Sequence, residues 1–226
     1  MQPWIHLASA TAPQGDTLRL LRRGEEFSIR LEGGNELMNS RLGGSEEALA
    51  SLTLDRLSDR AVPRVLIGGL GMGFTLRAAQ LAAPPDTCFV VSEIVPELVD
   101  WASQYMTNVF QNCLADPRLE ISLGDVGGLI EGAPKAFDVI LLDVDNGPDG
   151  LTRAENDTLY GTAGLQSAHR ALTPGGVLAV WSATQDKTFA KRLSQCGFEV
   201  AEHSVRASRS KRGSRHTIWT AVRLDR

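Results

Sequence analysis

From Arg64 onward, short apolar segments alternate along the chain with segments in which apolar residues recur at helical spacing. The apolar segments are residues 65–69, 88–93, 119–125, 137–143 and 177–183. The helical patterns are residues 73–83, 96–106, 164–172 and 187–197. Nearly continuous apolar strands that alternate with helices are typical of a parallel sheet covered by helices on both faces. Two further strands, 198–205 and 216–224, have no helical pattern between them, so we expect an antiparallel strand at one edge.

The residues before this region show strand alternation. Leu18–Leu21 and Phe27–Leu31 are alternating stretches separated by a glycine turn, which predicts a β-hairpin. Ser45 and the two glutamates after it are typical of a helix start. We therefore predict a small N-terminal β segment at residues 1–44 and an α/β domain at residues 45–226.

Composition limits the classes of function. Of the 226 residues, 42% are hydrophobic and 22% are charged, and no apolar run reaches the roughly 18–20 residues of a membrane span. No basic segment precedes an apolar stretch at the N-terminus, which argues against a signal peptide. The three cysteines lie far apart, which favours reduced thiols over disulfides or a metal site. The net charge of −4 gives no general reason to expect nucleic-acid binding. These features predict a cytoplasmic protein without a bound metal.

Residues suited to ligand binding gather where the predicted strands end. The segment Gly69-Leu70-Gly71-Met72-Gly73 follows the first strand and opens a helix. Glycines let a backbone turn tightly and approach a ligand closely, and a helix N-terminus presents free amide groups. Glu93, Asp125 and Asp143 end the next three strands. Each feature alone is compatible with an ordinary turn or a solvated side chain, but together they favour a nucleotide site at the carboxyl edge of the sheet.

The spacing of the glycines separates two classes of nucleotide. A dinucleotide fingerprint, G-x-G-x-x-G, would need a glycine at position 74, which is Phe74. The pattern G-x-G-x-G is instead that of class I methyltransferases. We therefore predict an adenosyl nucleotide of the S-adenosylmethionine type on residues 68–73, with its ribose hydroxyls bound by Glu93.

Several segments also resemble the spermidine synthase family. VLIGGLGMGFTLR (65–77) is similar to the family segment VLVIGGGDGGTLR. Further similar segments are SEI (92–94), ISLGD (121–125), FDVILLDVDNGPDG (137–150) and RALTPGGVLAVWS (170–182). The resemblance covers about residues 17–183. It implies an α/β fold of the Rossmann-like methyltransferase type, with a seven-stranded, mostly parallel sheet, helices on both faces and a small N-terminal β-hairpin appendage. Members of the family are often homodimers, so the resemblance also implies a possible homodimer.

The same resemblance implies roles for individual residues. Those implied to bind the nucleotide are Gly69, Gly71, Gly73, Glu93 and Asp125, the last beside the adenine. Asp143 is implied to accept a proton from the attacking amine or to orient it, and Asp145 is the second candidate catalytic acid. The implied co-substrate is S-adenosylmethionine or its decarboxylated form, and the implied partner is a small-molecule acceptor, an amine.

Departures from the family pattern leave the reaction open. Met72 stands where the family has an aspartate, which favours methyl transfer, whereas Asp143 with Asp145 favours a cationic acceptor. Strict counting places Asn146 at the position of the second loop aspartate, and Asp145 takes that place only after a shift of one residue. Aminopropyl transfer, methyl transfer to another acceptor and nucleotide binding without catalysis are therefore three hypotheses.

A basic segment, Arg206–Arg215, suggests a fourth hypothesis, modification of RNA. A solvated loop between two edge strands explains the same residues more simply. We therefore do not expect nucleic acid as a partner.

Overall fold

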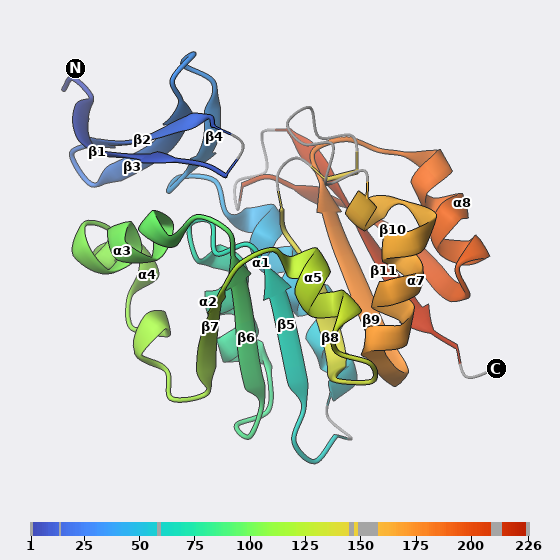
Figure 1. Ribbon diagram of the computed structural model, residues 1–226. Coiled ribbons are helices and arrows are strands. Elements are labelled where there is room, and N and C mark those ends of the chain that lie inside the picture. Colours follow the sequence, from blue (N-terminus) through green and yellow to red (C-terminus); the bar gives the residue numbers. More distant parts are fainter. Residues whose placement is uncertain are drawn as a thin grey trace.

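The computed structural model describes residues 2–13, 15–57, 60–144, 147–148, 158–208 and 214–224, which form two sheets (Figure 1). The larger sheet has seven strands in the order β10-β11-β9-β8-β5-β6-β7. These strands are β5 (Arg64–Gly68), β6 (Cys88–Glu93), β7 (Leu119–Leu123), β8 (Phe137–Leu142), β9 (Leu172–Ser182), β10 (Phe198–Arg206) and β11 (Arg215–Arg223). The predicted α/β fold with a mostly parallel sheet is confirmed. One detail was wrong: the antiparallel strand is β11, second from the edge, and β10 lies outside it.

Helices cover both faces of this sheet because neighbouring residues of each strand point to opposite sides. Val65 and Ile67 of β5 belong to one buried cluster and Leu66 to the other. The first cluster packs under α1 (Gly44–Leu54), α2 (Phe74–Ala82), α3 (Pro96–Gln104) and α4 (Thr107–Phe110). The second packs under α5 (Val126–Glu131), α7 (Thr162–Ala171) and α8 (Lys187–Gln195), which lie in front of the sheet in Figure 1. Short 3₁₀ turns occur at Asp55–Leu57 and Cys113–Ala115.

The N-terminal residues form an antiparallel four-stranded sheet rather than a hairpin alone. Its strands, in order, are β1 (Ile5–Thr11), β2 (Thr17–Arg23), β3 (Glu26–Leu31) and β4 (Glu36–Asn39). The predicted hairpin is β2–β3. Leu20 and Ile29 face each other across it and are fully buried in the same cluster as the first face of the large sheet. The small sheet is therefore part of the main core on this side.

The order of the parallel strands reverses between β5 and β8. From β5 the chain continues outward through β6 to β7, whereas β8 continues to β9 on the other side. At this junction the backbone N–H of Asp143 donates to the carbonyl oxygen of Gly68 over 3.1 Å. Because the helices on the two sides diverge from such a reversal, a crevice opens beyond these strand ends.

Among the described residues, none of the helices has both the length and the apolar character needed to cross a bilayer. The same residues contain no group of three or more His, Cys, Asp or Glu side chains arranged to hold a metal ion.

Candidate functional site

The glycine loop lies at the strand reversal, and its backbone is in a conformation that excludes most other residues. Gly69 has φ +88°, and a Cβ there would lie 2.7 Å from the carbonyl oxygen of Asp143. Gly73 has φ +74°, and a Cβ there would lie 2.6 Å from the ring of Phe110. Gly71 has φ +52°, but a Cβ there would meet nothing within 4 Å. Gly69 and Gly73 thus fit the loop against β8 and α4, while Gly71 leaves space for a ligand.

Glu93 lies at the end of β6 and holds the glycine loop in place. Its Oε2 accepts a hydrogen bond from the backbone N–H of Leu70 over 2.9 Å, and its Oε1 accepts one from Val95 over 2.8 Å. The side chain is buried, with 5% of its surface exposed. A carboxylate has about four acceptor positions, so these two bonds are compatible with further bonds from hydroxyl groups. Glu93 therefore joins the loop to the start of α3 at the wall of a cavity.

Two cavities meet at the carboxyl edge of the sheet. The first, of about 120 Å³, is lined by five of the predicted site residues, Gly69, Gly71, Glu93, Asp125 and Asp143. The second, of about 260 Å³, shares Gly71 and Asp143 with the first and extends toward α1 and β11. Asp125 is exposed, and its side chain caps α5 by accepting from the Gly128 N–H over 3.3 Å. The structure therefore brings most of the predicted residues together and places Asp143 where the two cavities join.

Asp143 is half-buried and is oriented by α2. The hydroxyl of Thr75 donates a hydrogen bond of 2.7 Å to its Oδ2. Burial raises the pKa of Asp143, and the Thr75 hydrogen bond opposes this effect because it stabilises the charged form. A carboxyl group held in this way is suited to exchange a proton near neutral pH.

A second carboxyl group, Glu46 of α1, lines the larger cavity. Burial is the main reason that its pKa is raised, and repulsion from Asp143 is the next. The hydroxyl of Ser45 donates to its Oε2 over 2.6 Å and also contacts Nδ1 of His216 at 2.9 Å. Sequence reasoning took Glu46 only as part of a helix start. Its spacing contained a signal, because Glu46 precedes the buried residues Leu49 and Ala50 by three and four positions and so lies on the inner stripe of α1.

Two aromatic side chains, Trp181 and His216, also line the larger cavity. Trp181 is 7% exposed, and its ring lies 4.8 Å from that of His216, edge to face. Burial lowers the pKa of His216. The buried Nε1 of Trp181 has no hydrogen-bond partner among the described residues.

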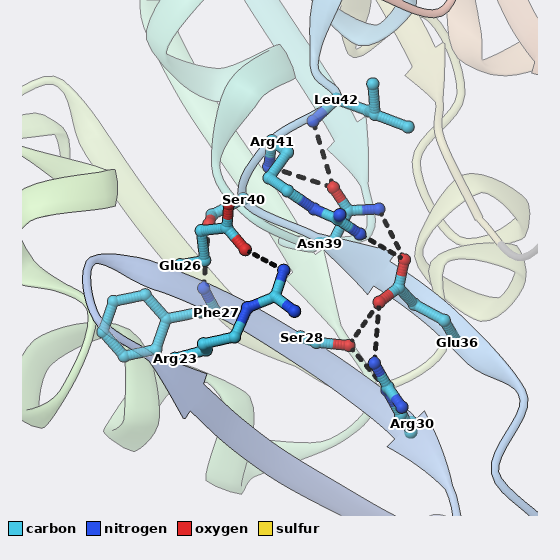
Figure 2. A network of polar contacts seen from close by, with 10 residues as sticks. All are labelled: Arg23, Glu26, Phe27, Ser28, Arg30, Glu36, Asn39, Ser40, Arg41 and Leu42. Carbon is cyan, nitrogen blue, oxygen red and sulfur yellow. Dashed lines mark hydrogen bonds and ion pairs between the residues drawn. The ribbon is translucent and has the colours of Figure 1, made fainter. Parts of the chain in front are cut away.

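Part of the wall of both cavities comes from β4, and a polar network holds that strand in position (Figure 2). Glu36 accepts hydrogen bonds from Ser28 over 2.6 Å and from Asn39 over 2.9 Å, and it pairs with Arg30 and Arg41. The Asn39 Oδ1 in turn accepts from two backbone N–H groups of the turn that follows. Between the ends of this network, Leu37 and Met38 face the cavities. The N-terminal sheet is thus a component of the site.

Some sequence predictions fall outside the described residues. These are Asp145, the second candidate catalytic acid, Asn146 and the centre of the basic segment, residues 209–213. Tyr160, which follows this part of the chain, is fully buried and packs edge to face on Phe189 in the core.

Comparison with known proteins agrees with this architecture. Residues 49–201 match the spermine/spermidine synthase domain. The polyamine aminopropyltransferase of Mycobacterium tuberculosis strain H37Rv is 28% identical over 163 residues, which are 70% of this chain and 29% of that protein. Polyamine aminopropyltransferase 2 of Pseudomonas aeruginosa is 33% identical over 155 residues, 64% of this chain and 42% of that protein. This chain thus spans less than half the length of either relative.

The fold is similar to that of solved spermidine synthases. The crystal structure of spermidine synthase from Thermotoga maritima superposes with a TM-score of 0.73 at 18% identity, covering 97% of this chain and 73% of that one. The domain match includes α2, the strand ends at Glu93 and Asp143 and most of the large sheet. Since it extends over more than half of the chain, the protein belongs to the family defined by the spermine/spermidine synthase domain.

Proposed function

We propose that the protein transfers the aminopropyl group of decarboxylated S-adenosylmethionine to an amine. The observation that carries this proposal is the place of Asp143, which lines both the cavity at the glycine loop and the larger cavity beside it. A donor in the first cavity and an acceptor in the second would meet at this carboxyl group. The names of the relatives, polyamine aminopropyltransferases, support the same reaction.

The residues around the first cavity fit an adenosyl nucleotide. Gly71 leaves its wall open, and the N-terminus of α2 begins directly after the loop. Glu93 and Asp125 line the same cavity, where they can accept hydrogen bonds from ribose and adenine groups. We propose these residues, with Gly69 and Gly73, as the nucleotide site.

In the proposed reaction Asp143 acts as the proton acceptor. An alkylamine enters as an ammonium ion, and one proton passes from its nitrogen to a carboxylate oxygen. The freed nitrogen lone pair then forms a bond to the carbon beside the sulfonium. The carbon–sulfur bond breaks with its electron pair going to sulfur, which leaves methylthioadenosine. The positive charge of the sulfonium moves to the new ammonium, and the proton on Asp143 is released to solvent.

Methyl transfer from S-adenosylmethionine is the second candidate, and Met72 favours it. This side chain is buried, lines the larger cavity and supplies no charge to attract the ammonium of a decarboxylated donor. Nucleotide binding without transfer is the third hypothesis, and the altered loop sequence DVDNGPDG (143–150) motivates it, because strict counting places Asn146 where the family has its second loop aspartate.

One assay separates these functions. The full chain is incubated with either donor and with 1,4-diaminobutane or spermidine, and methylthioadenosine and S-adenosylhomocysteine are quantified. Aminopropyl transfer yields methylthioadenosine from the decarboxylated donor only, and it is lost in Asp143→Asn but retained in Asp100→Asn, an exposed aspartate on α3. Preference for the carboxylated donor would refute aminopropyl transfer. Calorimetric binding of methylthioadenosine without any turnover would support the non-catalytic alternative.

The division into residues 1–44 and 45–226, a homodimeric assembly and a cytoplasmic location remain predictions from the sequence. Sedimentation analysis of the purified chain tests the dimer.

A further inference from the structure

The larger cavity combines apolar walls with two carboxyl groups. The apolar residues that line it are Leu37, Met38, Leu42, Met72, Phe74, Trp181 and Ala183. The two acidic residues among its described lining residues are Glu46 and Asp143, which reach it from α1 and from the end of β8. Apolar walls with a local concentration of negative charge suit a ligand with an alkyl stem and a cationic head.

The two carboxyl groups are close enough to affect each other. Asp143 raises the pKa of Glu46 by repulsion, and Thr75, which donates to the Asp143 carboxylate, also contacts the backbone oxygen of Glu46 at 3.4 Å. The hydroxyl of Ser45 donates a hydrogen bond of 2.6 Å to the Glu46 carboxyl. Each carboxyl of the pair is therefore held by a hydroxyl group, that of Asp143 from α2 and that of Glu46 from α1.

No counter-ion accompanies this pair in the described part of the chain. Neither carboxyl forms an ion pair there with a lysine, arginine or histidine. His216 of β11 also lines the cavity, but burial lowers its pKa and favours its neutral form. Glu47, the next residue of α1, lines two other cavities, whose lining comes from both α1 and α2. Because two neighbouring carboxylates without a cation are unfavourable when buried, a cationic ligand would stabilise them.

We propose that Glu46 is a specificity-determining residue of the acceptor site, where it holds the positively charged amine together with Asp143. This inference rests on the proposed aminopropyl transfer and adds to it a second acid for the acceptor. Glu46 lines the larger cavity and is absent from the described lining of the glycine-loop cavity, so it serves the acceptor rather than the nucleotide. The proton that leaves the ammonium passes to the carboxyl pair and then to solvent, and the bonds made and broken are those of the proposed transfer.

The test compares Glu46→Gln, Glu46→Asp and the matched control Glu47→Gln. Each variant of the full chain is assayed with decarboxylated S-adenosylmethionine and 1,4-diaminobutane, and KM is measured separately for donor and amine. Binding of 1,4-diaminobutane to each variant saturated with methylthioadenosine is measured by calorimetry, which needs no turnover. Thermal unfolding checks that each variant is folded.

We expect Glu46→Gln to raise the KM for the amine at least tenfold while the KM for the donor changes less than twofold. Glu47→Gln should match the wild type, and Glu46→Asp should recover part of the amine affinity. Equal amine affinities in Glu46→Gln and Glu47→Gln would overturn the role of Glu46 and leave aminopropyl transfer standing. A rise in the donor KM alone would also overturn it, because Glu46 would then serve the donor.

If the wild type transfers nothing to any amine, the proposed function fails and calorimetry alone decides the role of Glu46. Amine binding that is weakened at least tenfold in Glu46→Gln, but not in Glu47→Gln, would then still support an amine site. Binding that does not depend on Glu46 would overturn it.

Discussion

The hydroxyl of Thr75 donates a 2.7 Å hydrogen bond to Oδ2 of Asp143, and this bond joins the first turn of α2 to the end of β8. The glycine loop and the candidate catalytic acid are thus linked by a side-chain contact as well as through the sheet. Thr75 is buried, so the bond is shielded from competition by water.

Thr75→Val should therefore lower kcat/KM for amine transfer while Thr75→Ser retains most of it. A hydrogen bond to a charged group contributes about 1.5–3 kcal/mol, which corresponds to a roughly 10- to 100-fold loss. Since the bond also opposes the rise in the pKa of Asp143, its removal should move the acidic limb of the pH–rate profile to higher pH. Equal rates in the valine and serine variants would show that the hydroxyl does not orient the acid.

Alanine substitutions at two positions of the glycine loop should have different effects, one mainly on stability and the other mainly on ligand binding. Gly69→Ala places a Cβ 2.7 Å from the Asp143 carbonyl oxygen at a positive φ, so we expect a loss of about 2 kcal/mol or more in the free energy of unfolding. Gly71→Ala meets no neighbour, so its cost is about 1 kcal/mol from the left-handed backbone alone, but its methyl group enters the cavity wall. Urea denaturation and calorimetry with methylthioadenosine measure the two effects. An equal loss of stability in both variants would contradict this assignment.

Glu93→Gln should weaken both the loop and the nucleotide site. The amide group of glutamine cannot accept at both positions, so it would face the N–H of Leu70 or of Val95 with a donor. Such a mismatch in a buried position costs about 1–3 kcal/mol. We expect at least a tenfold loss of methylthioadenosine affinity by calorimetry, with Asp100→Asn on the exposed side of α3 as control. Unchanged affinity would remove Glu93 from the proposed site.

The pair Glu46 and Asp143 predicts a pH dependence of stability. Folding raises the pKa of Glu46 from 4.5 to about 7 and that of Asp143 from 3.8 to about 6, so the folded state holds more protons than the unfolded state between these values. The free energy of unfolding contributed by the pair therefore falls as pH rises through this range. His216 has the opposite effect on stability. Because its pKa is lowered from 6.5, the folded state binds fewer protons than the unfolded state at pH values below 6.5, and the contribution of His216 to the free energy of unfolding rises with pH.

The difference between wild type and Glu46→Gln isolates the glutamate from the other groups. The variant should be more stable than the wild type at pH 8, by on the order of 1–3 kcal/mol, and the difference should vanish below about pH 4.5. Glu47→Gln, the same substitution at the next residue of α1, whose side chain lines other cavities, is the matched control. Urea denaturation at several pH values measures this, and a constant difference across the range would contradict the coupling.

Much of the first cavity was predictable because parallel strands place their ends at one edge. Glu93, Asp125 and Asp143 lie in separate segments of the sequence, yet each follows an apolar strand, and the order of the strands brings them to one cavity. The glycines were recognisable from their spacing, and their φ values explain that spacing.

The second cavity was harder to predict because its residues come from elements that meet only through tertiary packing. Glu46 is at the start of a helix, Leu37 and Met38 are in a four-residue strand, and His216 is on β11. The helical stripe of α1 contains a local signal for Glu46. No comparable signal marks β4, which pairs with β3 through an irregular register and is held by the side chain of Glu36.

The position of β5 between β6 and β8 has a consequence for the order in which parts of the site fold. Strands β5, β6 and β7 follow one another along the chain, so the glycine loop and Glu93 can assemble from contacts between consecutive segments as the polypeptide emerges from the ribosome. Asp143 reaches Gly69 only after the chain has returned past all three strands, a closure of long sequence separation that is slow to form. The proposed nucleotide loop therefore depends on contacts between neighbouring segments, whereas the candidate catalytic carboxyl group joins it through a contact of long sequence separation.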